Sequence, residues 1–293
     1  MSKQMDPRAP EPKPTFPEQS QSSPGLEAKM DPAPDYGEQS YQGTGKLKGR
    51  VALITGGDSG IGRAVALAFA REGADVAISY LNEDVDAQET QRVIEAAGRK
   101  SLALPGDLTE VAACEKLIAD TVKQFGRIDI LVNNAAYQGK ELERLEDLTP
   151  ERLERTFKTN VFAMFHLVRL ALPHMKEGAT IINTASIQAY QPTASIIDYA
   201  ATKGAIVTLT KGLSQDLISR GIRVNCVAPG PVWTPLIAQS FDAKAVSEFG
   251  KDSLIGRPAQ PVELAPSYVF LASNDARYVN GEVLGVTGGK LLA

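Results

Sequence analysis

The chain has 293 residues, of which 43% are hydrophobic and 23% are charged, and its formal net charge is −4. This is the composition of a soluble globular protein, and it excludes collagen-like, coiled-coil and disulfide-rich small-domain classes. A net acidic chain offers no basic surface for nucleic acid or anionic lipid. No apolar run approaches the roughly 18 residues of a membrane span, and the N-terminus lacks the apolar core of a signal peptide. We therefore expect a cytoplasmic protein without a membrane or nucleic-acid partner.

Cysteine and histidine are scarce, with two residues of each. Cys114 and Cys226 are far apart and form no disulfide framework, so we expect both to be buried and unreactive. His166 and His174 lie eight residues apart, with no partner at metal-ligand spacing. We therefore predict that the protein has no metal site.

Residues 1–46 differ in composition from the rest of the chain. They contain 8 of the 18 prolines and a single leucine, and they lack isoleucine and valine. Such a segment cannot bury enough apolar surface to offset the entropy lost on ordering, so it should be extended or disordered. Phe16, Tyr36 and Tyr41 are candidate anchors onto a neighbouring surface. The segment is therefore either a solvated tail or a strap that docks on the same or an adjacent subunit.

From Leu47 onward, short apolar runs alternate with amphipathic stretches, which predicts alternating strands and helices. The predicted strands cover 51–55, 75–79, 101–104, 128–132, 180–184, 223–227 and 282–286. The predicted helices cover 61–72, 84–97, 110–125, 150–175, 198–220 and 261–272. Regular alternation of this kind is typical of a doubly wound α/β domain, in which helices cover both faces of a parallel sheet. We expect residues 47–293 to form one such domain with about seven parallel strands.

A glycine-rich turn joins the first predicted strand to the first predicted helix. Its sequence is Thr-Gly-Gly-Asp-Ser-Gly-Ile-Gly over residues 55–62. Glycines there allow a tight turn and close approach of a pyrophosphate, which the free N–H groups and the positive end of the helix then bind. The placement of the turn predicts a dinucleotide site. Its candidate residues are Gly56, Asp58, Ser59, Gly60, Ile61 and Gly62.

The Gly-x-x-x-Gly-x-Gly spacing of this turn resembles the short-chain dehydrogenase/reductase family. Four further segments match the family's motifs in order, so that the resemblance covers residues 47–293. They are Asp107-Leu108, Asn133-Asn134-Ala135 (with Ala136 in place of the usual glycine), Ser186 with Tyr199-x-x-x-Lys203, and Pro229-Gly230 with Val232 and Thr234. The resemblance implies a Rossmann fold and a nicotinamide dinucleotide, NAD or NADP. It also implies that Asp107 contacts the adenine and that the segment from Pro229 holds the nicotinamide carboxamide.

Tyr199 and Lys203 are four residues apart, and they therefore share one helix face. A tyrosine ordinarily titrates near pH 10, and a fixed ammonium beside it should lower this pKa. Tyr199 could then exchange a proton with an alcohol or carbonyl oxygen, while Ser186, just after the fifth strand, donates to the same oxygen. The resemblance adds Asn160, which bends its helix in the family and holds a water that links the lysine to solvent.

The residues near the expected ribose lean towards NAD, and NADP or the use of both cofactors stays open. The second predicted strand ends without the arginine that would hold a 2′-phosphate and without the acid that would bind a 2′-hydroxyl. Asp58 in the glycine turn is a carboxylate close to the expected ribose. There it would accept hydrogen bonds from free ribose hydroxyls and repel a 2′-phosphate.

The substrate is the part of the function that the residues specify least. The expected walls are Gln138, Ile187, Gln188 and Tyr190 together with a lid over 231–256. Gln188, Gln191 and Trp233 would suit hydroxylated or small carbonyl compounds, although Tyr190 and Trp233 could instead pack inward. The tail and core together resemble the glucose/ribitol-dehydrogenase-like bacterial branch, which includes general stress proteins and aldehyde reductases. That branch implies hydride transfer between an alcohol (polyol or sugar-like) and an aldehyde or ketone.

A second hypothesis is a catalytically silent dinucleotide-binding sensor or scaffold. A sensor has no need of the full set of Asn160, Ser186, Tyr199 and Lys203, and this set therefore favours the enzyme. The resemblance further implies a homotetramer with the tyrosine-bearing helix at one interface. Small and apolar residues on that helix are compatible with close packing: Ala200, Ala201, Ala205 and Leu209.

Overall fold

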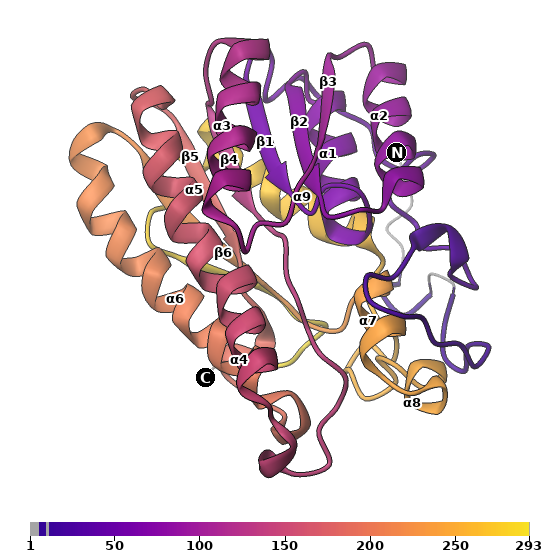
Figure 1. Cartoon of the computed structure of the whole chain (residues 1–293). Coiled ribbons are helices and arrows are strands. Elements are labelled where there is room, and N and C mark those ends of the chain that lie inside the picture. Colours follow the sequence, from indigo (N-terminus) through magenta and orange to yellow (C-terminus); the bar gives the residue numbers. More distant parts are fainter. Residues whose placement is uncertain (1–5, 10–11, 293) are drawn as a thin grey trace.

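Seven parallel strands form one sheet in the order β3-β2-β1-β4-β5-β6-β7 (Figure 1). The computed structural model describes residues 6–9 and 12–292. The strands are β1 (Val51–Thr55), β2 (Asp75–Tyr80), β3 (Ser101–Pro105), β4 (Ile130–Asn133), β5 (Thr180–Thr184), β6 (Arg223–Pro229) and β7 (Val283–Val286). The central strands β1, β4 and β5 are buried along their whole length, as strands covered on both faces should be. The predicted parallel α/β sheet is confirmed, and each strand ends within two residues of its predicted bounds.

Helices cover both faces of this sheet (Figure 1). One face carries α1 (Gly60–Arg71), α2 (Asp84–Ala96) and α9 (Pro261–Ala272), and the other carries α3 (Val111–Phe125), α4 (Pro150–Phe157), α5 (Ala163–Ala171) and α6 (Ile197–Leu217). Each layer buries its own apolar cluster against the sheet. Among the described residues, none of the helices combines the length and the apolar composition that crossing a bilayer requires.

The predicted helix over 150–175 is not continuous. It is interrupted by one π-helical turn, Lys158–Phe162, between α4 and α5, and it ends in a short 3₁₀ turn, Leu172–His174. Periodicity alone did not show this interruption because apolar residues continue across it. The π turn matters for function because it contains Asn160, and π turns often occur at functional sites.

The strand order reverses between β1 and β4. The chain runs outward from β1 through β2 to β3, and it then returns to place β4 on the opposite side of β1. Loops that leave β1 and β4 therefore diverge and open a crevice at the carboxyl ends of the strands. In open α/β sheets this crevice is the usual ligand site.

Residues 12–46, which we call the N-terminal strap, lie along the domain of the same chain. Its one helical element is a short 3₁₀ turn, Glu27–Lys29, and the rest consists of extended stretches and turns, such as the one closed by the bond from the Tyr41 N–H to the Gly37 oxygen at 3.0 Å. It is not a solvated tail: Phe16 is 5% exposed, and its ring centroid lies 4.1 Å from that of Trp233. Tyr36 and Tyr41, the other expected anchors, donate hydrogen bonds to Glu89 and Glu72 of the domain. In Figure 1 the strap is the indigo segment beside α7 (Pro235–Ser240) and α8 (Ala243–Ser247).

Candidate active site

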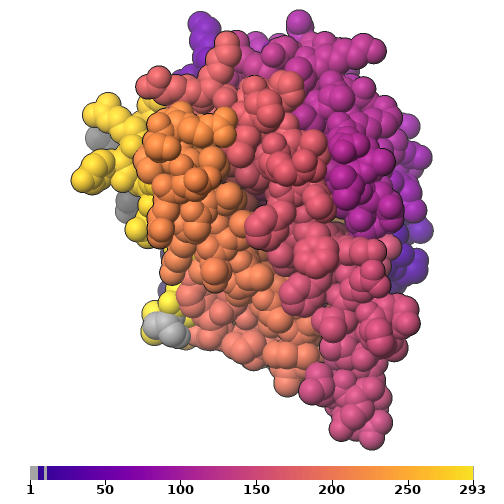
Figure 2. Space-filling view, turned by 60° about the vertical axis from the view of Figure 1, so that its left-hand side comes forward, coloured from indigo at the N-terminus to yellow at the C-terminus, as the bar shows by residue number. Residues whose placement is uncertain are grey.

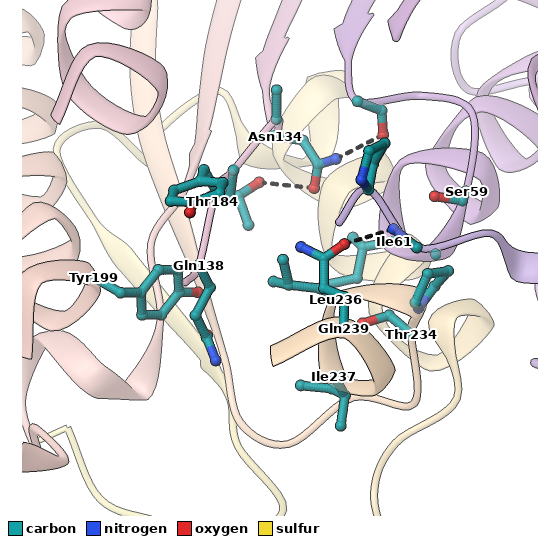
Figure 3. A pocket seen from close by; sticks show the side chains of 18 of the residues that line it. Ser59, Ile61, Asn134, Gln138, Thr184, Tyr199, Thr234, Leu236, Ile237 and Gln239 are labelled. Atoms are coloured by element: carbon teal, nitrogen blue, oxygen red, sulfur yellow. Dashed lines mark hydrogen bonds between the residues drawn. The ribbon is translucent and has the colours of Figure 1, made fainter. Parts of the chain in front are cut away.

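A pocket of about 340 Å³ opens at the carboxyl ends of β1, β4, β5 and β6 (Figure 3). This volume lies within the range of roughly 300–1,000 Å³ that is usual for small-molecule sites. Most residues predicted from the sequence line it. They are Gly56, Asp58, Ser59, Gly60, Ile61, Asp107, Leu108, Asn134, Ala135, Gln138, Ser186, Gln188, Tyr199, Lys203, Pro229, Gly230, Val232 and Thr234. The fold thus brings segments more than 170 residues apart in sequence onto one cavity.

The glycine turn has the backbone shape that a diphosphate site needs. Gly56 has a φ of +60°, a conformation that glycine adopts readily. A Cβ at Gly62 would lie 1.8 Å from the carbonyl oxygen of Gly56, so only glycine allows α1 to start this close to the turn. The Asn134 amide donates to the carbonyl oxygens of Thr55 and Gly56, at 3.1 and 3.0 Å, and holds the turn against β4. With the positive end of α1 at the cavity, these residues fit a nicotinamide dinucleotide.

Two buried carboxylates lie at the end of the pocket formed by the glycine turn and β2. Asp58 and Glu83 both line the cavity, and they are 5% and 9% exposed. Burial, together with the neighbouring charge of Glu83, raises the pKa of Asp58 to about 7. Glu83 accepts the main-chain N–H groups of Leu81 and Asn82 at 3.0 and 2.8 Å. The sequence predicted Asp58 but not Glu83, which lies three residues beyond the end of β2.

Asp107 lines the same cavity after β3 and is held in place from two sides. Its carboxylate accepts the N–H of Thr109 at 3.0 Å and lies 3.6 Å from the guanidinium of Arg155. Arg155 also stacks over the ring of Tyr137, at 5.4 Å from the centroid. These contacts fix Asp107 at the pocket wall, and its contact with adenine stays a prediction.

Tyr199, Lys203 and Ser186 come together on the opposite side of the pocket. Lys203 Nζ lies 5.1 Å from the centroid of the Tyr199 ring and donates to the main-chain oxygen of Thr184 at 2.8 Å. The Ser186 hydroxyl interacts with the Tyr199 side chain and favours its phenolate form. In Figure 3 the Tyr199 ring reaches into the cavity beside Gln138. The three side chains are buried and surround one position at which a substrate oxygen could bind.

The pKa of Tyr199 differs from the expectation based on its charged neighbour. Burial raises this pKa to about 12, because a phenolate is poorly solvated there, and the contact with Ser186 offsets only part of the effect. Burial also lowers the pKa of Lys203 to about 8. In the chain by itself, burial therefore shifts the tyrosine pKa in the direction opposite to the expectation, and the lowering by the Lys203 ammonium stays a prediction.

Asn160 lies behind the pocket wall. It is fully buried in the π turn, accepts the N–H of Tyr137 at 2.7 Å, and donates to the oxygens of Tyr137 and Thr202 at 2.9 and 3.0 Å. Asn160 thereby ties the loop after β4 to α6, which carries Tyr199. These bonds give it a positioning role, and a water link to Lys203 stays a prediction.

Four other predicted residues do not line the cavity. Asn133 donates to Asn183 at 2.9 Å, between β4 and β5, so it joins strands and does not face a ligand. Gly62 lies inside the first turn of α1, and Tyr190 is half-buried outside the pocket. Trp233 is fully buried against Phe16, so the inward-packing alternative holds for it.

The cavity also has walls that no motif indicated. Two short helices, α7 and α8, form in the expected lid, and α7 contributes Pro235, Leu236, Ile237 and Gln239. Ser23, Pro24 and Gly25 of the N-terminal strap, and Lys290 near the C-terminus, also line the pocket. No local pattern marks these residues, because their places depend on how distant segments pack together.

Comparisons with known proteins relate the chain to oxidoreductases. The family model described as Enoyl-(Acyl carrier protein) reductase matches residues 56–290. The chain is 51% identical to glucose and ribitol dehydrogenase of Daucus carota, covering 94% of this chain and 97% of that protein. It is 50% identical to general stress protein 39 of Bacillus subtilis, covering 94% of this chain and 97% of that protein. It is 49% identical to the chloroplastic NADPH-dependent aldehyde reductase 1 of Arabidopsis thaliana, covering 92% of this chain and 96% of that protein.

Solved structures show the same fold. A short-chain dehydrogenase from Burkholderia cenocepacia, in complex with NADP, has a TM-score of 0.75 and is 34% identical, covering 83% of this chain and 98% of that one. A 3-ketoacyl-(acyl-carrier-protein) reductase from Brucella melitensis, complexed with NADH, has a TM-score of 0.74 at 34% identity, with the same coverage. Given the glycine turn, the Ser-Tyr-Lys group and these matches, the chain belongs to the short-chain dehydrogenase/reductase family of oxidoreductases.

Proposed function

We propose that this protein is an NAD(P)-dependent oxidoreductase that interconverts a polyol or sugar-like alcohol with the corresponding aldehyde or ketone. The observation that carries the proposal is the meeting of Tyr199, Lys203 and Ser186 at one end of a cavity whose other end is a glycine turn. Two relatives described above, a glucose and ribitol dehydrogenase and an aldehyde reductase, support this substrate class.

Tyr199 acts as the general acid or base in this proposal. A bound nicotinamide would accept a hydride from the alcohol carbon or return it to the carbonyl carbon. In the oxidative direction Tyr199 takes the hydroxyl proton, and in the reductive direction it gives that proton to the carbonyl oxygen. Ser186 donates to the same oxygen and stabilises the negative charge that develops on it. Lys203, held by Thr184, places a positive charge beside the ring.

In the chain without cofactor, burial holds Tyr199 as a neutral phenol at neutral pH, and this is the form that can donate a proton to a carbonyl oxygen. To act as a general base in alcohol oxidation, Tyr199 would first have to lose that proton, at a cost that grows with the distance between its pKa and the working pH. The ratios of oxidised to reduced cofactor and of alcohol to carbonyl set the net direction of the reaction.

We propose NAD(H) as the preferred cofactor. Asp58 and Glu83 place two carboxylates where the end of β2 meets the glycine turn, close to the expected adenosine ribose. A 2′-phosphate would bring a further negative charge into this partly desolvated cluster, whereas a free 2′-hydroxyl can donate to it. Relatives differ in their cofactor, since one is named NADPH-dependent and one solved neighbour holds NADH, so the preference depends on these local charges.

Gln138 is the best candidate for orienting the substrate. It is 4% exposed and lines the pocket beside Tyr199, and its side-chain nitrogen has no hydrogen-bond partner among the described residues (Figure 3). A buried donor without a partner costs about 1–3 kcal/mol, which a substrate hydroxyl or carbonyl could recover. Gln188 is less suited, because its amide already exchanges two hydrogen bonds with Thr193. Gln191 is also engaged, through the carbonyl oxygen of Leu291.

The deciding experiment is turnover of aldehydes, ketones and polyols with NADH, NADPH and their oxidised forms, followed at 340 nm. The proposal expects turnover of at least one hydroxylated aldehyde or polyol, and it expects Tyr199→Phe to abolish that turnover. Tight cofactor binding without turnover of any substrate in either direction would instead support the sensor or scaffold. The buried, mutually arranged catalytic set favours the enzyme, because dinucleotide binding alone does not require it.

We further propose a cytoplasmic homotetramer. Figure 2 shows the face on which α4 and α5 lie beside α6. Phe162 and Phe165 are 48% and 52% exposed at the start of α5, and a partner subunit could cover these apolar rings. Of the residues expected at this interface on α6, Ala201 is exposed, whereas Ala200 and Leu209 are buried in the chain's own core. The mass in solution, from light scattering, tests the assembly.

A further inference from the structure

The N-terminal strap touches the dinucleotide pocket from outside the domain that the family motifs define. Ser23, Pro24 and Gly25 line the cavity. We propose that the strap is a working part of the cofactor site: it clamps the lid, residues 231–256, to the glycine turn and so retains the bound dinucleotide. This inference rests on the proposed function only in taking the pocket to bind a nicotinamide dinucleotide.

The strap is bonded to the lid at several points. The Phe16 ring packs on Trp233. The main-chain N–H of Phe16 donates to the main-chain oxygen of Ser247 at 2.8 Å. The N–H of Gln21 donates to the Ala238 oxygen of α7 at 2.8 Å. These are main-chain and aromatic contacts, which hold the lid at its start, its middle and its end.

Gly25 makes the closest approach to the pocket. Its N–H donates to the side-chain oxygen of Gln239 at 2.6 Å, one of the bonds drawn in Figure 3. A Cβ at Gly25 would lie 2.8 Å from the carbonyl oxygen of Pro235, so the strap fits against the start of α7 only with glycine at this position. Any larger residue here must lift the strap from the lid.

Glu27 connects the strap to the opposite wall. Its carboxylate accepts the N–H of Gly60, the first residue of α1, and pairs with Arg63, in both cases at 2.5 Å. The N–H of Glu27 in turn donates to Asp86 of α2 at 2.7 Å, and Arg63 also bonds Asp86. All three side chains are buried. A strap residue is therefore part of the same network that positions the helix start for the diphosphate.

The segment between these anchors is preorganised. Gln21 uses both ends of its side-chain amide on the main chain of Leu26, donating to the oxygen at 3.1 Å and accepting from the N–H at 2.7 Å. Gln19 similarly joins Asp31. The loop thus binds as a shaped unit, which limits the entropy lost when it docks.

The start of α1 and the residue before α7 meet at one edge of the pocket, since a Cβ at Gly60 would lie 3.0 Å from the Thr234 side chain. An outward movement of α7 would open this edge and widen the way out for a bound dinucleotide. Because the strap is fixed to both walls, that movement must break strap contacts, which raises the barrier to release.

The extents of the matches indicate that the strap is shared with the carrot dehydrogenase and not with the two solved structures. The two solved structures described above cover 83% of this chain, about the share that residues 47–293 make up. The carrot dehydrogenase covers 94%, more than those residues alone can supply, so its similarity extends into the strap.

The test compares release of NADH from the full-length wild type and from strap variants. Phe16→Ala removes the lid anchor, Gly25→Ala lifts the strap from α7, and Glu27→Gln removes the carboxylate charge at α1. Glu18→Gln and Ser22→Ala are matched controls, since both residues are exposed and lie in the same strap. Bound NADH is displaced with excess NAD⁺ in a stopped-flow instrument, and thermal melts show which variants are folded.

We expect the NADH dissociation rate to rise at least fivefold in Phe16→Ala and Gly25→Ala and to stay within twofold of wild type in both controls. Trp233 is the single tryptophan of the chain and lies under Phe16, so its fluorescence reports strap release. Acrylamide quenching of this fluorescence should increase in the same two variants. A general loss of stability would not cause this increase at temperatures far below the melting temperature. If Phe16→Ala fails to fold, Gly25→Ala and Glu27→Gln decide the outcome.

Folded variants whose NADH release stays within twofold of wild type would overturn the clamp. A wild type that binds neither NADH nor NADPH would overturn both this inference and the proposed function. Binding without turnover of any substrate would overturn the proposed function alone, because the release measurement needs no catalysis.

Discussion

Lys203 donates a hydrogen bond from Nζ to the main-chain oxygen of Thr184, at 2.8 Å. Thr184 is the last residue of β5, two residues before Ser186, and its hydroxyl lies 2.8 Å from that of Tyr268 on α9. The lysine therefore fixes α6 to the strand that presents the serine. We propose that in the site it holds Tyr199 and Ser186 at a constant separation as well as supplying charge.

The first prediction concerns proton transfer. Tyr199→Phe should lower kcat at least about a hundredfold in either direction, because the ring stays in place while its proton is lost. The dissociation constant for NADH, measured by fluorescence, should change less than threefold. Turnover that survives this substitution would remove Tyr199 from its assigned role.

The second prediction concerns stability and pH at Lys203. The unfolded chain keeps the Lys203 proton up to about pH 10.5, whereas burial lowers the folded-state pKa to about 8. Between these values the unfolded state binds more protons, so stability should increase as the pH rises from 8 to 10.5, by about 3 kcal/mol. Lys203→Met should lack this increase. Urea unfolding of both proteins at pH 7, 8, 9 and 10 tests the difference, and parallel curves would contradict it.

The third prediction concerns cofactor choice. The wild type should bind NADH at least tenfold more tightly than NADPH, which corresponds to about 1.4 kcal/mol. The double variant Asp58→Asn/Glu83→Gln should reduce this ratio at least fivefold by removing the buried negative charge. Asp84→Asn, an exposed carboxylate next to Glu83, is the control and should leave the ratio unchanged. A wild type that prefers NADPH would refute the carboxylate mechanism.

The fourth prediction separates two glycines on helices. Gly62→Ala should cost at least about 2 kcal/mol and abolish NADH binding, because its Cβ would lie 1.8 Å from the oxygen of Gly56. Gly212→Ala on α6, where a Cβ meets nothing within 4 Å, should stabilise the chain by up to about 1 kcal/mol. Urea denaturation gives both values. Equal effects at the two positions would show that helix propensity, and not the turn geometry, is being measured.

The fifth prediction concerns substrate orientation. Gln138→Leu should raise KM for a hydroxylated aldehyde at least tenfold, because it removes the unpartnered donor beside Tyr199. The KM for a small aldehyde without hydroxyl groups should change less than threefold. Gln188→Leu is the matched comparison, and its smaller effect would follow from the bonds that Gln188 already makes to Thr193.

Local patterns were sufficient to predict the fold. Buried runs such as Val51–Thr55 and Thr180–Thr184 are strands at the predicted bounds, because residues that are apolar on both faces suit only the interior of a covered sheet. Periodicity did not reveal the π turn at Asn160, since the apolar period continues through it, although the family resemblance implied a helix bend at this residue. The side-chain chemistry of the turn, Ser186 and Tyr199 was also readable, because each belongs to a short motif.

Residues whose place depends on tertiary packing could not be predicted. Glu83 and Gly25 reach the pocket only because β2 lies beside β1 and the strap crosses the lid. Asn133 shows the opposite error: it belongs to a recognisable motif, yet its side chain bonds Asn183 and faces away from the cavity. The pKa of Tyr199 also required the structure, because burial depth decides whether desolvation or the neighbouring charge prevails.

The contacts between strap and lid join residues that are more than 200 positions apart, as between Gly25 and Gln239 or between Trp233 and Pro32. During synthesis the strap leaves the ribosome before its partners in the lid, which follow more than 200 residues later. The strap must therefore wait, undocked, while strands β1 to β6 emerge. This end of the pocket can close only when residues 231–256 have emerged, so a chain that stopped before them would be unable to hold its cofactor in this way.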